Sequence, residues 1–161
     1  MAKKHASSGT PATVALDRAG VAYEVRAYHH DPAASFGLEA AEALGVDPAR
    51  VLKTLLVDTG SGLAVGIVPV DRQLDLKALA HALGVKRVAM ADPAAVERSS
   101  GYVVGGISPV GQKRALPTVL DQSAVEQSTV LVSGGRRGFD LELAPADLVA
   151  VTRAVTAPIA R

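Results

Sequence analysis

The stretch from residue 51 to residue 70, VLKTLLVDTGSGLAVGIVPV, carries the pattern that decides the fold. Its two apolar runs, residues 54–57 and residues 63–68, flank the turn sequence Gly60-Ser61-Gly62. Apolar runs of this length on either side of a glycine-rich turn are typical of a hairpin of two buried strands. We therefore predict a central hairpin, with Lys53 at the start of its first strand.

Helix and strand patterns alternate on both sides of this hairpin. Helices are predicted where caps, prolines and glycines bracket amphipathic segments, over residues 10–20, 35–45, 76–84, 92–101 and 145–153, with a short helical turn from residue 47. Strands are predicted over residues 21–26, 85–90, 118–120, 129–132 and 139–143. This alternation, without a break in composition or a repeat, predicts one α/β or α+β domain in which helices cover a mixed sheet.

Length and composition favour a single globular domain. The 161 residues are enough to bury a sizeable core. Apolar residues make up 48% of the chain and charged residues 20%, which excludes disorder of the whole chain. The first nine residues lack the apolar core of a signal peptide, and we expect them to form a disordered tail before a domain over residues 10–161. No run approaches 18 apolar residues, so no membrane span is predicted.

The residue types exclude several classes of chemistry. The chain contains no cysteine, which excludes disulfides, thiolate metal sites and a cysteine nucleophile, and fits a cytoplasmic protein. Its four histidines show no metal-ligand spacing, and no GxSxG motif marks a serine hydrolase. We therefore expect no metal and no cofactor. His30 beside Asp31 is interpreted either as a pair that stabilises a turn or as part of a site.

Charge gives little indication of nucleic-acid binding. A net charge of +1, from 17 basic and 16 acidic residues, provides no overall field that would hold nucleic acid nonspecifically. Five aromatic residues leave little for a platform on which single-stranded bases stack. Basic residues nevertheless form three pairs, at positions 86–87, 113–114 and 136–137. Each pair forms either a solvated face or a binding patch.

Three features point to a pocket without fixing its chemistry. The glycine-rich segments 105–106 and 133–138 allow a ligand to approach backbone N–H groups closely, but neither matches a nucleotide-binding motif and both are compatible with tight turns. Lys53 lies among apolar residues of a predicted buried strand. Its ammonium group either reaches the rim of the sheet or projects into a cavity, where it would hold a phosphate, a carboxylate or a developing oxyanion.

At these residues the sequence closely resembles the YbaK family of aminoacyl-tRNA deacylases, relatives of the editing domain inserted in some bacterial prolyl-tRNA synthetases. The matching segments occur in the same order from about residue 10 to the C-terminus: YHHDP (28–32), FG (36–37), VLKTL (51–55), QLDLK (73–77), MADP (90–93), RSSGY (98–102), GGISP (105–109) and SGGRRG (133–138). The resemblance implies a single-domain YbaK-like fold, a mixed β-sheet or irregular barrel covered by helices.

The resemblance also implies a trans-editing enzyme that removes cysteine mischarged on tRNA(Pro), with Cys-tRNA(Cys) as a second candidate substrate. In the mechanism proposed for the family, the cysteinyl thiol attacks its own ester carbonyl and gives a cyclic thiolactone and free tRNA. That chemistry requires no enzyme nucleophile, metal or cofactor, which agrees with the residue types present. The implied partners are the acceptor end of tRNA(Pro) and prolyl-tRNA synthetase.

The same resemblance assigns roles to individual residues. Lys53 and Gly105 match the two functional positions of the family. Lys53 would favour negative charge on the ester or the terminal phosphate, and Gly105 would let backbone groups hold the substrate closely. The other candidates would bind the α-amino group and the terminal adenosine; they are Tyr28, Ser133 and Asp140, with Thr54, Gly106 and Ser108 at neighbouring motif positions.

Two other functions remain open on the sequence. An enzyme of the same fold that hydrolyses another ester, such as Ala-tRNA(Pro), would use water and would not depend on a thiol. A noncatalytic module would bind an RNA end or a nucleotide in the same pocket and leave the ester intact. Esters that differ only in their amino acid therefore distinguish these functions.

Overall fold

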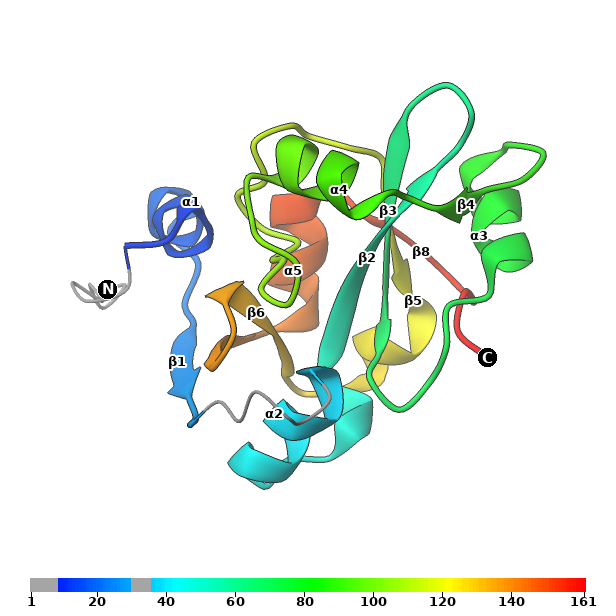
Figure 1. Ribbon diagram of the computed structural model, residues 1–161. Helices are drawn as coiled ribbons and strands as arrows, with labels where there is room; N and C mark the ends of the chain where they lie inside the picture. Colours follow the sequence, from blue (N-terminus) through cyan, green and yellow to red (C-terminus); the bar gives the residue numbers. More distant parts are fainter. Residues whose placement is uncertain (1–8, 30–35) are drawn as a thin grey trace.

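The predicted central hairpin is confirmed by the computed structural model, which describes residues 9–29 and 36–161 (Figure 1). Its strands are β2 (Leu52–Asp58) and β3 (Leu63–Pro69). They pair antiparallel over their whole length, from Leu52 opposite Pro69 to Asp58 opposite Leu63, without a shift of register. Alternation of side chains along this regular pair decides which residues of β2 face the core.

The hairpin lies inside a five-stranded mixed sheet with the order β4-β2-β3-β5-β8. β2 pairs antiparallel with β4 (Ala89–Met90). On the other side, β3 pairs parallel with β5 (Thr118–Asp121), and β5 pairs parallel with β8 (Val155–Ala157). The predicted mixed sheet is thus present, but the remaining strands form a separate sheet.

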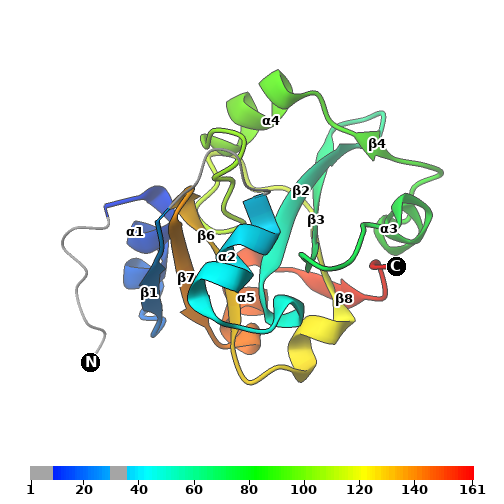
Figure 2. The same ribbon diagram turned by 60° about the horizontal axis from the view of Figure 1, so that its bottom comes forward.

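A second, antiparallel sheet has the order β1-β7-β6. Its strands are β1 (Glu24–Ala27), β6 (Val130–Arg136) and β7 (Phe139–Leu143). The two sheets meet where Val51, just before β2, forms a parallel bridge with Leu131 of β6. α2 (Phe36–Leu44) lies across this corner (Figure 2), and its Ala40 belongs to the core cluster that contains both bridge residues.

The helices begin and end where the local signals predict. α1 (Pro11–Ala19) begins after a Thr10 capping box and ends at Gly20, and η1 (Pro48–Arg50) is the predicted helical turn. α3 (Leu76–Leu83) and α4 (Pro93–Ser100) are each capped by an aspartate and end at a glycine with positive φ. α5 (Pro145–Thr152) completes the set, with η2 (Gln122–Glu126) as an additional turn. No helix among the described residues is long and apolar enough to span a membrane.

The largest core cluster lies between the two sheets. It combines Leu52 and Ile67 of the five-stranded sheet with Val132 and Leu141 of the three-stranded sheet, all less than 5% exposed. Burial of this apolar surface is the main force that holds the sheets together.

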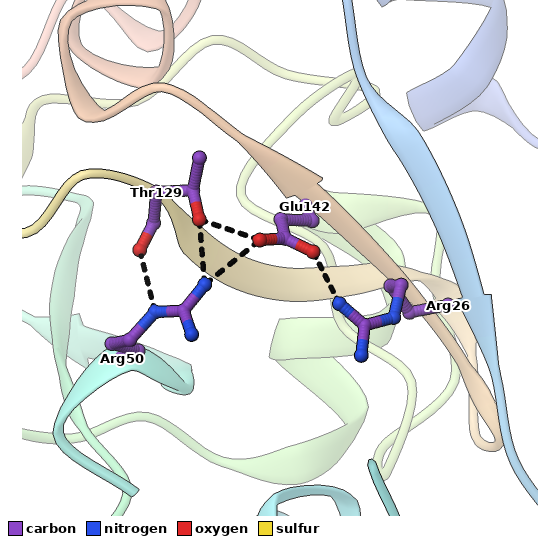
Figure 3. A network of polar contacts seen from close by, with 4 residues as sticks. All are labelled: Arg26, Arg50, Thr129 and Glu142. Carbon is purple, nitrogen blue, oxygen red and sulfur yellow. Dashed lines mark hydrogen bonds and ion pairs between the residues drawn. The ribbon is translucent and has the colours of Figure 1, made fainter. Parts of the chain in front are cut away.

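An ion-pair network ties the three-stranded sheet to the start of β2 (Figure 3). Glu142 of β7 accepts hydrogen bonds from Arg26 of β1, Arg50 of η1 and the Thr129 hydroxyl; the Arg50 contact measures 2.8 Å. The Thr129 hydrogen bond is the main influence that lowers the pKa of Glu142, and burial opposes it. Because Arg50 lies directly before the bridge residue Val51, the network fixes the corner at which the two sheets meet.

Several strand bounds differ from the sequence prediction: β1 covers Glu24–Ala27 and not residues 21–26, and β6 continues beyond residue 132 to Arg136. Two further differences concern the edge strands of the five-stranded sheet. The strand predicted over residues 85–90 is limited to Ala89 and Met90, because only these two residues find a partner at the end of β2. Strand β8 was not predicted, since its three residues gain their strand conformation only by pairing with β5. Residues 1–8 of the expected tail and Ser35, the expected cap of α2, lie outside the described residues.

Candidate functional site

A cavity of about 330 Å³ opens beside the corner where the two sheets meet. Residues of β2, β6 and β7 form its inner wall, and residues of α4 and the following loop form the opposite wall. The predicted residues that line it are Tyr28, Lys53, Thr54, Gly105, Ser133 and Asp140. Segments that lie far apart in the sequence are therefore brought to one cavity.

Strand register places the polar residues of the cavity in one row. Ser133 of β6 lies directly opposite Asp140 of β7. Lys53 is two residues beyond Val51, and Ser133 is two residues beyond Leu131, so the parallel bridge between Val51 and Leu131 sets these two residues at corresponding levels. The row thus brings together a cation, a hydroxyl and a carboxyl.

Asp140 is the most deeply buried ionisable group of this row. It is 6% exposed, and burial raises the pKa of its carboxyl from 3.8 to about 7. No ion pair with Asp140 is present among the described residues. A buried carboxylate without a cation is well placed to receive one from a ligand, such as an α-ammonium group.

Tyr28 lies close enough to this carboxyl to respond to its charge, and Lys53 lines the same cavity. Burial, followed by the charge of Asp140, raises the pKa of the Tyr28 hydroxyl. Burial also lowers the pKa of Lys53, with the charge of Asp71 acting in the opposite direction. Lys53 therefore lines the cavity and is partly desolvated, and the charge that acts on it is that of Asp71 in the exposed turn after β3. Projection of its ammonium group into the cavity stays a prediction.

The edge of β2 is open toward the cavity. The Val70 N–H donates to the Val51 carbonyl at 2.8 Å, which directs the backbone groups of the odd-numbered residues of β2 toward β3. The backbone N–H and carbonyl of Thr54, an even-numbered residue, consequently point to the opposite edge of β2, away from β3. Between the bridge at Val51 and the pairing of β4 with Val57, no described strand covers that edge. The Thr54 N–H and carbonyl are thus positioned to bind a ligand.

Gly105 belongs to the loop that forms the opposite wall. Its φ of +98° is rarely accessible to a residue with a side chain, which explains glycine at this position. The neighbouring Gly106 does not line the cavity: a Cβ there would lie 2.7 Å from the Arg136 Cα. Gly106 instead allows the loop to pack against the end of β6.

Ser108 also lies behind the wall and not in it. It is completely buried, and its hydroxyl accepts a hydrogen bond from the Val110 N–H at 3.2 Å. The Tyr102 hydroxyl donates to the Val110 carbonyl at 2.6 Å, so the two contacts hold the same turn. Gly106 and Ser108 therefore support the Gly105 loop in this structure.

Sequence reasoning missed the basic and apolar parts of the lining. Arg136 and Arg137 line the cavity, although the sequence left them as a solvated pair or a patch. The Arg136 guanidinium lies 4.2 Å from the centroid of the Phe139 ring, and Arg137 forms an ion pair with Glu39 at 3.3 Å. Their place in the glycine-rich segment 133–138 was the available signal.

The apolar side of the cavity has no recognisable sequence motif. It is formed by aliphatic residues of β2, β4, α4 and their loops: Leu52, Leu56, Met90, Ala91, Val96 and Ile107. We call these residues the apolar half of the cavity and the lining around Asp140 its polar half, to which Ala40, Val51 and Val70, packed with Tyr28, add some apolar surface. His30 and Asp31 lie outside the described residues.

Comparisons with known proteins find similar sequences over most of the chain. The family model described as an aminoacyl-tRNA editing domain matches residues 30–151. Over 160 residues the chain is 36% identical to EbsC of Enterococcus faecalis, provisionally named a Cys-tRNA(Pro)/Cys-tRNA(Cys) deacylase, with 99% of this chain and 98% of EbsC covered. Over 98 residues it is 31% identical to the proline–tRNA ligase of Moorella thermoacetica, with 61% of this chain and 17% of the ligase covered.

Solved structures with the same arrangement extend over nearly the whole chain. The crystal structure of a protein provisionally described as a trans-editing enzyme for prolyl-tRNA synthetase has a TM-score of 0.85 at 26% identity, covering 98% of this chain and 99% of that one. The hypothetical protein APE2540 has a TM-score of 0.85 at 27% identity, covering 94% of this chain and 100% of the other. The YbaK-like fold implied by the sequence is therefore confirmed.

Proposed function

This chain belongs to the aminoacyl-tRNA editing domain family, and from that premise we propose that it removes cysteine mischarged on tRNA(Pro), acting in trans. The observation that carries the proposal is the division of the cavity into two halves. A buried carboxyl, Asp140, lies in the polar half, and aliphatic side chains form the other. An aminoacyl ester has the matching parts, an α-ammonium group and a small side chain.

The polar half would orient the ester. Asp140 would accept the α-ammonium group, and the gain from pairing would offset part of the cost of burying its charge. Lys53 would stand close to the ester carbonyl, where its ammonium group would stabilise negative charge on the oxygen. Backbone groups of Gly105 and of the open β2 edge at Thr54 would complete the binding of the aminoacyl group.

We infer that the reaction uses the substrate's own thiol. Its sulfur would form a bond to the ester carbonyl carbon, and the bond from that carbon to the ribose oxygen would break. The proton that leaves the sulfur would end on the ribose hydroxyl, so the products would be a cyclic thiolactone and free tRNA. In this scheme the enzyme supplies proximity and charge stabilisation, and none of its side chains forms a covalent intermediate.

The proposal includes a partner and a domain assignment. We propose that residues 10–161 form the deacylase domain and that it binds the acceptor end of tRNA(Pro). A link to prolyl-tRNA synthetase is supported by the proline–tRNA ligases that match this domain within a longer chain. The separate chain would then meet the mischarged tRNA with the synthetase or after its release.

The test compares four esters on one tRNA. Purified protein is incubated with tRNA(Pro) charged with cysteine, S-methylcysteine, alanine or proline, and the initial rate of deacylation is measured. We expect loss of the cysteine ester alone, because methylation removes the nucleophile and alanine has none. Cleavage of the alanine and S-methylcysteine esters would instead identify a water-dependent hydrolase, and survival of all four would leave a binding module.

Two lysine variants show whether the cavity performs the reaction. Lys53→Ala should lower kcat for the cysteine ester by about a hundredfold, within the range reported for loss of one group that stabilises an oxyanion. Lys77→Ala removes an exposed lysine from α3 and serves as the control, with no expected effect. Equal rates for the Lys53→Ala variant and the wild type would contradict the role of Lys53.

A further inference from the structure

We propose that the Thr54 hydroxyl recognises the side-chain thiol of the substrate and thereby determines amino-acid specificity. The inference rests on the proposed function and adds to it the group that reads the amino acid. It follows from three observations: the face of β2 on which Thr54 lies, the state of its hydroxyl, and the division of the cavity into a polar and an apolar half.

Thr54 lies in an otherwise apolar row. The register of β2 with β3 is continuous, so Leu52, Thr54 and Leu56 point to the same face of the sheet. Leu52 and Leu56 belong to the large core cluster and are 4% and 2% exposed. Both also line the cavity, with Thr54 between them. The threonine thus places one hydroxyl among the apolar residues of the cavity wall, where its Oγ1 is covered from solvent.

That hydroxyl has no partner of its own. Thr54 Oγ1 is buried and makes no hydrogen bond to any described residue. Burial without a hydrogen bond costs free energy, and a valine of the same shape would avoid that cost. A hydroxyl that the fold does not use at a cavity wall points to a ligand that does. A staggered step about χ1 moves Oγ1 into the position now held by Cγ2 and so changes the direction in which the hydroxyl points, which allows it to meet such a ligand.

The chemistry of the two halves selects the ligand group. With its ammonium group at Asp140, the substrate would direct its side chain toward the apolar half. A thiol is small and largely apolar and carries one weak hydrogen-bond donor, which a single hydroxyl among aliphatic residues satisfies. A methyl group of similar size would leave the hydroxyl unpaired, and a site built around a hydrogen bond rejects the analogue that lacks it.

The experiment measures binding and so does not depend on ester cleavage. Two probes carry cysteine or 2-aminobutyrate in a stable amide bond to 3′-amino-3′-deoxyadenosine, so that they differ only in a thiol or a methyl group. We expect the wild type to bind the cysteinyl probe about fivefold more tightly, as one net hydrogen bond provides. Thr54→Val should abolish the preference, and Thr54→Ser, which keeps the hydroxyl, should retain it.

Thermal unfolding distinguishes substrate recognition from a structural role of the hydroxyl. If the hydroxyl stabilised the fold, its removal would lower the unfolding temperature. If the fold leaves the hydroxyl unpaired, Thr54→Val should unfold about 2–5 °C above the wild type. A lower unfolding temperature, equal binding of both probes by the wild type, binding of neither, or a preference retained by Thr54→Val would each overturn the inference. The deacylase proposal fails separately, when the wild type leaves Cys-tRNA(Pro) intact.

Discussion

Asp140 on β7 and Ser133 on β6 lie directly opposite each other in the register of the three-stranded sheet, where both face the cavity. Asp140 is a buried carboxyl without an ion-pair partner among the described residues. The position is costly for the fold whenever the carboxyl is ionised, because burial raises its pKa to about 7. This cost can be measured through the pH dependence of stability.

Replacement of Asp140 by asparagine should remove a pH-dependent loss of stability. The folded-state pKa of about 7 exceeds the ordinary value of 3.8, so the folded protein binds more protons between these values. The wild type should consequently lose stability as the pH rises from about 4 to about 7. Urea denaturation should show Asp140→Asn more stable than the wild type by about 2–4 kcal/mol at pH 8, and by much less at pH 4.

Asp121 provides a matched control with the opposite sign. It is 2% exposed, yet its carboxylate accepts hydrogen bonds from the backbone N–H groups of Ile159 at 2.9 Å and Ala160 at 3.0 Å. Burial raises the pKa of this carboxyl, but the hydrogen bonds from the Ser123 hydroxyl and these backbone groups lower it by more. The net pKa is therefore below the ordinary value. Asp121→Asn should therefore destabilise the protein at neutral pH, and the loss should shrink as the pH falls. The same pH dependence in both variants would contradict this account of Asp140.

Local signals account for the part of the fold that could be predicted. Asp75 and Gly84 bound α3, and Asp92 and Gly101 bound α4, because caps and left-handed glycines act within a single turn. The hairpin followed from a glycine-rich turn between apolar runs. Strand β8 depends instead on β5, which precedes it by more than thirty residues of sequence, and no local pattern encodes such a pairing.

The candidate site likewise combines features that the sequence predicts with features that depend on the whole fold. Six of the eight residues carried by the resemblance, Lys53 and Gly105 among them, line one cavity. The raised pKa of Asp140 arises from burial by several elements together, which a single strand pattern does not express. Ser108 and Gly106 lie in the same motif as Gly105 but face the core or the end of β6, because a tight loop turns successive residues in different directions.

Gly106→Ala tests whether close packing of this loop maintains the site. The added Cβ would meet the Arg136 backbone at 2.7 Å, a distance that requires the loop or the end of β6 to move. We expect a loss of about 1–3 kcal/mol of stability by urea denaturation, as for other overpacked sites, and a lower kcat for Cys-tRNA(Pro). Gly62→Ala is the control, since nothing lies within 4 Å of its Cβ position. Equal stability and activity of both variants would show that the loop tolerates the shift.

The Glu142 network should contribute stability that disappears in acid. Glu142→Gln keeps the shape of the side chain but removes the charge that Arg26 and Arg50 share. The Thr129 hydrogen bond and these charges lower the pKa of Glu142, so its contribution is present above the unfolded-state pKa and is lost as the pH falls through the folded value. We expect a loss of about 1–2 kcal/mol at pH 7 and a smaller one at pH 3 in urea denaturation.

An exposed glutamate separates this effect from a general change in charge. Glu126→Gln in η2 makes the same substitution at an exposed position and should leave stability unchanged. If Glu142→Gln also lowers kcat/KM for Cys-tRNA(Pro), the network positions the start of β2 as well as stabilising it. A loss at pH 7 that persisted undiminished at pH 3 would show that packing, and not charge, holds this corner.

Binding of the tRNA should depend only weakly on salt, because the chain has little excess positive charge. Its net charge is +1, and Arg137, which lines the cavity, is already paired with Glu39. Contacts with about two phosphates at the acceptor end would lower the affinity about tenfold between 50 and 200 mM KCl. Measurement of KM for Cys-tRNA(Pro) over this range provides the slope, and a short acceptor-stem helix should give the same slope as the full tRNA. A much steeper slope for the full tRNA would reveal an extended basic interface, and prolyl-tRNA synthetase would then not be needed to hold the substrate.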